Sequence, residues 1–437
     1  MPRSTLPIYV LCILLVFAAP TRADNWPQWR GPLATGVAPH GDPPVHWSET
    51  KNVRWKMTLP GRGHSSPVVW GDRVYVTAAV PAGKALPPRY ARRPGTHNNL
   101  PVTHHQRFIV LAINRANGEI VWQKLVHEAL PLEGGHETAS LASASPVTDG
   151  QYVFAFFGSH GLYCLNRKGD VQWQIDLGAM HTKHGHGEGA SPVLHGDTLI
   201  VNWDHQGDSF IVALNKHTGD QRWRMLRDEL TSWSTPIVIE HKGEAQVIVN
   251  GTNRIRSYDL TTGKVIWECA GLSANIVASP VFADGYVYAA SSYVKKAMLA
   301  IRIDGAAGDI THTNHIVWKS RRGTPYVPSL LLYDDALYFL SHYQNVLSRV
   351  IAKTGQQPSG PYRLPAIGNV YASPVGAADR IYITDLNGVT LVMTHEQTPK
   401  VLAVNRLDDS FSASAAIAGR ELFLRGSRYL YCIAKVQ

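Results

Sequence analysis

The side chains best suited to metal chemistry form one short run in the middle of the chain, His181-x-x-His184-x-His186-x-Glu188. Imidazole and carboxylate groups suit zinc, copper, nickel or iron, and the glycines between these residues would let a loop bring its ligands together. The spacing is neither a cysteine-rich nor a helical metal motif. The run therefore predicts a metal site of four ligands, with an exposed polar loop as the alternative interpretation.

A second set of candidates lies outside this run, in segments between apolar stretches. We predict that a small ligand or cofactor would be bound by Arg62, His64, His136, His160, His205 and Trp233. The histidines among them could also complete a metal site, and the indole ring offers a stacking surface. No residue is assigned a catalytic role, because the chain has no GxSxG, HExxH or phosphate-binding glycine loop.

The elements that must position these residues recur along the chain. Each repeat has an opening such as Ser-Pro-Val, a Gly–Asp type of turn, short apolar runs and a closing Trp, as in residues 190–223. The first copy opens at Pro67. After a gap of 79 residues that must hold an insertion, openings lie near 146, 192, 236, 280, 329, 374 and 415, in steps of 41 to 49 residues. Short apolar runs between turn residues predict antiparallel strands. A period in the forties with four strands is typical of a β-propeller blade.

Eight copies predict an all-β, eight-bladed β-propeller of four-stranded antiparallel blades over residues 24–437. The last copy ends without a closing strand, whereas residues 53–57 precede the first copy and have no partner in it. We therefore expect residues 53–57 to form the outer strand of blade eight and close the ring. The recurring tryptophans are expected to pack between blades: Trp122, Trp173, Trp223, Trp267 and Trp318.

The Ser-Pro-Val opening, the Ala-Leu-Asn/Asp turn and the Thr-Gly-x-x-x-Trp close resemble the repeats of the PQQ-like (quinoprotein-type) β-propeller superfamily. The WPQWRGP segment, residues 26–32, is similar to the one that precedes the first blade in many secreted members. The resemblance covers roughly residues 24–437 and implies the propeller fold. It implies no single function, because the repeat serves quinoprotein dehydrogenases as well as non-catalytic scaffolds such as the outer-membrane assembly lipoprotein.

A quinoprotein dehydrogenase of alcohols or sugars would hold pyrroloquinoline quinone (PQQ) with Ca²⁺, as the resemblance implies. Trp233 could then support the quinone, and the carboxylates of PQQ could meet Arg62, Lys183 and Arg322. The cation could be held by Glu137, Glu188 and Asn275, and the base could be Asp204 or Asp409. The adjacent cysteine pair of those enzymes is absent here. The three later cysteines are far apart and are expected to be buried: Cys164, Cys269 and Cys432. No cofactor is assigned on these grounds, and PQQ with Ca²⁺ or a transition metal stays an alternative.

Strand direction places the candidate residues on one face of the ring. In a four-stranded blade, the loop between strands two and three and the segment leading into the next blade emerge on the same side, because antiparallel strands alternate in direction. Residues 78–107, rich in Pro, Arg and His and without an acid, form an insertion on that side of blade one. We expect a histidine-rich face around the channel mouth and a functional or disordered loop over residues 78–107.

Residues 1–23 read as a secretory signal, because an early arginine and an apolar stretch precede Thr21-Arg22-Ala23. We expect export to the periplasm, the cell surface or the medium. No later stretch approaches the length of a transmembrane helix. The formal net charge of +9 comes without a long basic run or a nucleic-acid motif, so no nucleic-acid partner is expected.

These features predict an exported, monomeric propeller that is not an enzyme. It would act as a binding or assembly scaffold for a protein partner or a small ligand at its histidine-rich face. A PQQ- and Ca-dependent dehydrogenase and a metal-binding propeller are the two alternatives.

Overall fold

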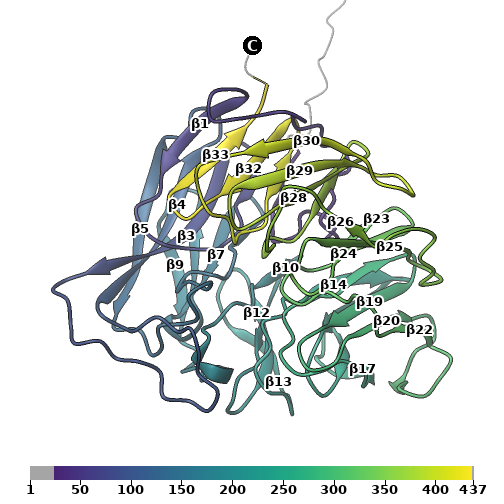
Figure 1. Cartoon of the computed structure of the whole chain (residues 1–437). Coiled ribbons are helices and arrows are strands. Elements are labelled where there is room, and N and C mark those ends of the chain that lie inside the picture. Colours follow the sequence, from purple (N-terminus) through teal and green to yellow (C-terminus); the bar gives the residue numbers. More distant parts are fainter. Residues whose placement is uncertain (1–23, 436–437) are drawn as a thin grey trace, which may run out of the picture.

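A computed structural model of the protein describes residues 24–435, which form eight sheets around one axis (Figure 1). The predicted signal segment, residues 1–23, lies outside the described residues. The helical elements of residues 24–435 are two 3₁₀ turns, η1 (Gly158–His160) and η2 (Lys183–Gly185). No helix in this part of the chain is long and apolar enough to cross a membrane. The predicted all-β, eight-bladed propeller is confirmed.

Each blade has four antiparallel strands, and the first strands of neighbouring blades contact one another around the axis. Blades one to four contain β2 (Val68–Trp70), β3 (Arg73–Ala82), β4 (His105–Asn114) and β5 (Ile120–Ala129); β6 (Val147–Thr148), β7 (Tyr152–Phe156), β8 (Leu162–Asn166) and β9 (Val171–Ile175); β10 (Val193–His195), β11 (Thr198–Trp203), β12 (Phe210–Asn215) and β13 (Gln221–Leu226); β14 (Ile237–His241), β15 (Glu244–Val249), β16 (Ile255–Asp259) and β17 (Val265–Cys269). Blades five to eight contain β18 (Val281–Ala283), β19 (Tyr286–Ser291), β20 (Ala297–Arg302) and β22 (Ile316–Ser320); β23 (Leu331–Tyr333), β24 (Ala336–Leu340), β25 (Val346–Ile351) and β26 (Tyr362–Arg363); β27 (Val375–Ala377), β28 (Arg380–Thr384), β29 (Val389–Thr394) and β30 (Val401–Arg406); β31 (Ala416–Ala418), β32 (Glu421–Arg425), β33 (Tyr429–Ile433) and β1 (Val53–Thr58). In blade four, β21 (Gly308–Asp309) adds a short parallel fifth strand beside β17, which the repeat pattern did not predict.

The ring closes through the N-terminal strand, as predicted. β1 pairs antiparallel with β33, with Trp55 opposite Cys432 and Thr58 opposite Tyr429. In Figure 1 this purple strand lies beside the yellow strands of blade eight. The chain therefore joins its two ends within one sheet, which leaves no open edge between the first and last blades.

Tryptophans of the outer strands join neighbouring blades, as the repeat pattern predicts. In five cases the indole ring lies on a glycine in a turn of the next blade, and its Nε1 donates to a carbonyl oxygen of that turn. The pairs are Trp55 with Gly118, Trp122 with Gly169, Trp173 with Gly219, Trp223 with Gly263 and Trp318 with Gly355. Trp267 is fully buried, whereas Trp122, Trp173 and Trp318 are only partly buried, and the Trp267 Nε1 has no hydrogen-bond partner within residues 24–435.

We expect Gly263→Ala to lower the free energy of unfolding by about 1–3 kcal/mol, through overpacking against the indole ring. A Cβ at Gly263 would come within 2.6 Å of Trp223. Gly243 is the matched control, because its φ of 82° is as unfavourable for alanine as the 74° at Gly263, while nothing lies within 4 Å of its added Cβ. Chemical denaturation of both variants measures the difference. If both variants lose the same free energy of unfolding, packing of the Trp223 indole does not require glycine at position 263.

The blade-one insertion contains more strand than predicted. Residues 78–107 were expected to form a loop, but β3 runs to Ala82 and β4 begins at His105, so that these two residues pair. β3 continues through Pro81, which pairs with Gln106 although proline has no N–H to donate. The connection itself is residues 83–104, which reach beyond the other blades at the lower left of Figure 1.

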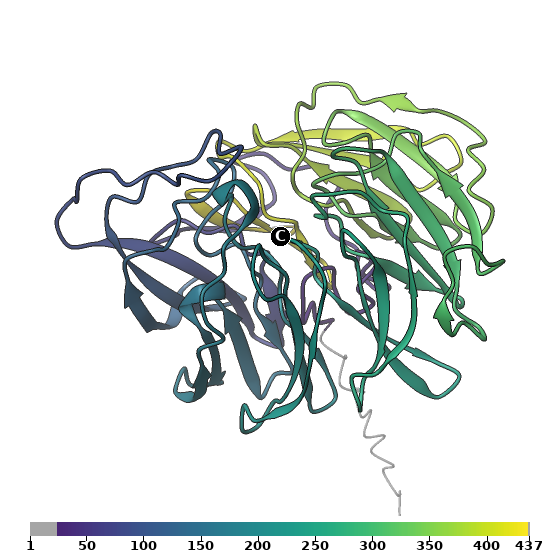
Figure 2. The same cartoon turned by 90° about the horizontal axis from the view of Figure 1, so that it is seen from below.

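The segment before β1 crosses the end of the channel opposite to the insertion. Its backbone bonds to first strands or adjoining turns in five blades, through Trp26 with Val69, Pro27 with Thr148, Thr35 with Leu332, Ala38 with Gly376 and Asp42 with Gly419. Arg30 is buried within this segment and donates to the carbonyl oxygens of Leu330 and Pro374, each at 2.7 Å. Seen from below (Figure 2), the purple N-terminal segment lies among the strands of several blades.

A ring of hydroxyl groups surrounds the axis above this segment. One Ser or Thr from each blade contributes, and we call the set the hydroxyl ring: Ser66, Ser145, Ser191, Thr235, Ser279, Ser329, Ser373 and Ser414. The backbone N–H of each of the first seven donates to the hydroxyl oxygen of the next, at 2.8–3.0 Å. Between blades eight and one, Arg425 makes the connection instead, donating to Ser65 and Thr77. The repeated serine of the sequence is therefore a link between blades.

Candidate functional site

A cavity of about 350 Å³ opens at the end of the channel that faces away from the N-terminal segment. Trp29 borders this cavity and also a smaller space on the other side, so its indole separates the two. The indole Nε1 donates to the hydroxyl of Ser414 at 3.4 Å. The channel is therefore blind: Trp29 closes one end and the cavity, which we call the funnel, opens at the other.

Histidines from four segments form one wall of the funnel. His64, His136 and His186 precede the first strands of blades one, two and three, and His97 comes from residues 83–104. The ring centroid of His186 lies 4.7 Å from that of His97 and 4.9 Å from that of His136. The predicted histidine-rich face around the channel mouth thus exists, and the insertion contributes to it.

Asn99 holds the insertion against this wall. Its Nδ2 donates to the carbonyl oxygens of His184 and Gly185, at 2.9 and 2.7 Å, and its Oδ1 lies 3.1 Å from Nδ1 of His186. The backbone N–H of Leu100 also donates to the carbonyl oxygen of Gly135. The conformation of the histidine run is therefore set by contacts with a segment about ninety residues earlier in the chain.

Aromatic side chains form the opposite wall. Tyr326 is stacked on His342 with ring centroids 4.7 Å apart, and the centroids of Tyr293 and Tyr343 lie 5.5 and 6.3 Å from that of Tyr326. Tyr343 and Tyr371 continue this wall, with their centroids 5.5 Å apart. Trp233 completes it, where its indole Nε1 donates to the carbonyl oxygen of Gly187 at 2.7 Å.

Glu188 is the one carboxyl group that lines the funnel among residues 24–435. Its two oxygens accept hydrogen bonds from the hydroxyl and the backbone N–H of Ser159, at 2.5 and 2.8 Å. Burial raises the pKa of Glu188 to about 7, because these two hydrogen bonds only partly offset the loss of hydration. The carboxyl group is therefore held by the protein rather than presented to a ligand.

The structure brings five of the ten predicted site residues to the funnel and leaves five outside it. His64, His136, His186, Glu188 and Trp233 line it. The other five lie elsewhere: Arg62 donates to the carbonyl oxygen of Glu137, His160 stacks on Phe108, His205 is buried beside Trp203, His181 pairs with Arg93, and His184 bonds to Pro94. The structure therefore gathers half of the predicted residues in one cavity, and their role in binding stays a prediction.

The four predicted metal ligands do not converge. Nδ1 of His181 is 2.6 Å from Arg93, and Glu188 is directed at Ser159, so only His184 and His186 remain close to each other. Within residues 24–435 no group of three or more His, Cys, Asp or Glu side chains is placed to hold a metal ion. The glycines of the run allow a ligand cluster, but contacts with the insertion direct the histidines and Ser159 directs Glu188 elsewhere.

Acid is expected to weaken the fold through buried imidazoles. Burial, with Arg62 and Arg425 nearby, lowers the pKa of His64 to about 3, and burial lowers the pKa of His160 to about 4. The unfolded chain binds these protons near pH 6.5. The free energy of unfolding is therefore highest above about pH 6.5 and falls as the pH drops toward 4. His160→Phe, which retains a ring against Phe108, is expected to flatten that decline in urea denaturation, and the same change at exposed His40 is not.

The funnel does not fit PQQ and Ca²⁺. PQQ is a tricarboxylate, and no Lys or Arg is among the lining residues of this part of the chain. Glu188 has both oxygens bound to Ser159 and has no second carboxylate or amide beside it in the lining. The three described cysteines are buried and free, as predicted, so none forms an adjacent pair. Ionic groups placed here would lose hydration without gaining a partner of opposite charge.

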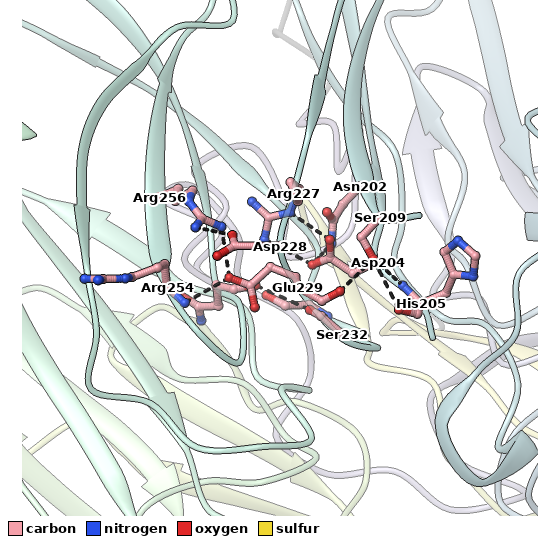
Figure 3. Close-up of polar contacts among 12 residues, drawn as sticks. Asn202, Asp204, His205, Ser209, Arg227, Asp228, Glu229, Ser232, Arg254 and Arg256 are labelled. Atoms are coloured by element: carbon pink, nitrogen blue, oxygen red, sulfur yellow. Dashed lines mark hydrogen bonds and ion pairs between the residues drawn. The ribbon is translucent and has the colours of Figure 1, made fainter. Parts of the chain in front are cut away.

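A buried ion-pair network lies beside the funnel, between blades three and four (Figure 3). Asp204 accepts two hydrogen bonds from Arg227, at 2.7 and 3.1 Å, and both side chains are fully buried. Burial alone would lower the pKa of Arg227, but the adjacent carboxylate outweighs it and the pKa is raised. Arg256 likewise pairs with Glu229 at 3.0 Å. Asp204, considered above as a base, is thus occupied by Arg227 and does not line the funnel.

Several funnel residues were not among the predicted site residues. They include the floor, Trp29, and the wall residues His97, Tyr293, Tyr326, Tyr343 and Tyr371. The repeat pattern could have predicted Tyr371, because the residue two positions before each member of the hydroxyl ring lines the funnel in all eight blades. These residues are His64, Ser143, Gly189, Trp233, Val277, Val327, Tyr371 and Ser412. No such pattern predicts His97, since its position depends on how residues 83–104 fold back.

Solved structures with this architecture include BamB and two dehydrogenases. BamB from Moraxella catarrhalis superposes with a TM-score of 0.59 and 16% identity, covering 87% of this chain and 99% of that one. A europium-containing methanol dehydrogenase gives 0.59 and 11% identity over 92% and 89%. Quinohemoprotein alcohol dehydrogenase ADHIIG from Pseudomonas putida HK5 gives 0.54 and 11% over 94% and 76%. At these identities the likeness shows a common fold only.

The sequence places the chain more narrowly than these superpositions. No curated protein matches it. A family model described as outer membrane protein assembly factor BamB matches residues 37–202, 106–357 and 207–435, which overlap and together span nearly all of the chain. With the eight-bladed ring and its PQQ-like repeats, this chain belongs to the family of propellers described as outer membrane protein assembly factor BamB.

Proposed function

We propose that this chain is an exported, non-catalytic binding propeller that holds a ligand in the funnel and serves as a scaffold at its histidine-rich face. The observation that carries the proposal is the blind channel, closed by Trp29 and open between the imidazole and tyrosine walls. A largely pre-formed pocket of a few hundred Å³ with convergent polar groups is typical of a ligand site. Export rests on the secretory pattern of residues 1–23.

The chemistry of the lining supports binding rather than catalysis. The one carboxyl group in it is bonded to Ser159, and burial raises the pKa of Cys164 and Cys269 to about 12. Neither a free carboxylate base nor a thiolate nucleophile is therefore offered to a ligand. The family description as an assembly factor agrees with a scaffold that also meets a protein partner at this face.

Titration with PQQ and Ca²⁺ separates this proposal from the dehydrogenase alternative. We expect the purified protein to show no stoichiometric quinone uptake in its absorption spectrum and no dye reduction with alcohols or aldoses, because the lining has no cation for the carboxylates. A quinoprotein dehydrogenase loaded in the same way is the positive control. Tight uptake with turnover would refute the non-catalytic function.

A further inference from the structure

We infer that the funnel binds the end of a neutral saccharide chain, an inference that rests on the proposed binding function and names its ligand. The tyrosine wall gives the first reason. Tyr293 is 43% exposed, and Tyr326 and Tyr343 line the cavity beside it. Aromatic rings combine a large apolar face with a polar edge, which matches a sugar ring with its C–H face and equatorial hydroxyls.

The funnel floor supplies hydrogen-bond donors that the protein does not use. Six members of the hydroxyl ring line the cavity: Ser66, Ser145, Ser191, Thr235, Ser373 and Ser414. Five of them accept a backbone N–H from the preceding blade, and none of the six donates a hydrogen bond within residues 24–435. A hydroxyl is both donor and acceptor, so each can still donate to an oxygen of a ligand. A cluster of such donors suits a polyol.

The absence of charge in the lining selects a neutral ligand. No Lys or Arg of residues 24–435 lines the funnel, and the one carboxyl, Glu188, is bonded to Ser159. Burial lowers the pKa of His136 and brings that of His186 to about 3, so these imidazoles are uncharged near neutral pH. The ammonium of Lys183, which is not among the lining residues, lies 5.8 Å from the ring centroid of Tyr293. An ion would lose hydration here without compensation.

The shape of the funnel selects a chain end. Because Trp29 closes the channel, a polymer cannot pass through and must enter by its terminus. The volume of about 350 Å³ leaves room for one or two sugar rings. A peptide is less suited, since the backbone N–H groups at the floor are already donated to the hydroxyl ring.

The test uses the purified full-length protein and calorimetric titration with maltotriose, cellotriose and triacetylchitotriose. We expect at least one trisaccharide to bind with a dissociation constant between about 10 µM and 1 mM, in the range of modest small-ligand affinities. Three comparison ligands lack one required feature each: β-cyclodextrin has no chain end, trigalacturonic acid is charged, and a blocked Gly-Tyr-Gly peptide has no sugar ring. Each is expected to bind at least tenfold more weakly.

Variants place the binding in the funnel. Tyr293→Ala and Tyr326→Ala are each expected to weaken the trisaccharide at least tenfold, and the change in intrinsic tryptophan fluorescence on binding should shrink with them. Tyr90→Ala is the matched control, because Tyr90 is 60% exposed in the insertion and does not line the funnel. If Tyr326→Ala does not fold, Tyr293→Ala still tests the site, because Tyr293 is 43% exposed and its removal leaves the fold intact.

The outcomes separate this inference from the proposed function. If no trisaccharide binds below about 10 mM, or if binding is unchanged in both funnel variants, the saccharide inference is wrong while a scaffold role stands. Tighter binding of the peptide or of trigalacturonic acid would replace it with another ligand class. Turnover with PQQ would instead overturn the non-catalytic function, whatever the sugars do.

Discussion

Replacing Asp204 by asparagine is expected to lower the free energy of unfolding by about 3–5 kcal/mol, because it leaves a buried charge without its partner. The Arg227 guanidinium faces Asp204 (Figure 3) and has no exposed surface. Within residues 24–435 it makes one further side-chain hydrogen bond, to the Tyr258 hydroxyl at 2.7 Å. An amide keeps the shape of the carboxylate but removes its charge. Urea denaturation followed by far-ultraviolet circular dichroism measures the loss.

The burial of the ion pair, rather than its presence alone, sets the size of this loss of stability. Glu128→Gln breaks the pair with Arg107 on the outer strand of blade one, where both side chains are about half exposed. That change is expected to cost less than about 1 kcal/mol, since water and salt screen exposed pairs. A loss at Asp204 no larger than the loss at Glu128 would show that water enters between blades three and four.

Arg30→Met is expected to cost about 3–5 kcal/mol and to loosen the floor of the funnel, because hydrogen bonds from charged groups contribute about 1.5–3 kcal/mol each. The Arg30 guanidinium is buried and gathers carbonyl oxygens of three segments, those of Thr35, Leu330 and Pro374. Methionine fills a similar volume but leaves these oxygens unsatisfied. Denaturation measures the stability, and acrylamide quenching of tryptophan fluorescence is expected to rise as the neighbouring Trp29 becomes accessible.

Arg167→Met is the control for loss of an arginine as such. The Arg167 side chain is 55% exposed and pairs with Asp72 on the surface, so its removal should change the stability by less than about 1 kcal/mol. Quenching should also stay as in the wild type. If Arg30→Met behaves like this control, the N-terminal segment is held by its backbone bonds to the blades and not by the guanidinium.

The arginines that stabilise the ring are separate from the residues that line the funnel. Arg30 and Arg227 hold the floor and one side of the ring, and they do so without lining the funnel. Most of the wall residues come from loops, either just before the hydroxyl ring or between second and third strands. One ring can therefore carry different ligand sites, because the loops change without disturbing the strands.

The sequence by itself determined the ring. The number of blades, the closing strand at residues 53–57 and the packing of the closing tryptophans all follow from a repeat in which each unit must bury its apolar faces against the next. Strand alternation also placed the histidines on one face. These features depend on the alternation of apolar and turn residues within a repeat and on contacts between equivalent strands of neighbouring repeats. Both can be read from the sequence.

Only the tertiary structure decided how the predicted metal run, the insertion and the N-terminal segment meet at the funnel. Asn99, from the insertion, sets the course of residues 184–186, and Ser159 holds Glu188, so the predicted metal run is divided among separate partners. Trp29 became the floor because the N-terminal segment bonds to five blades at once. Contacts of this kind join segments far apart in sequence, and no periodic pattern encodes them.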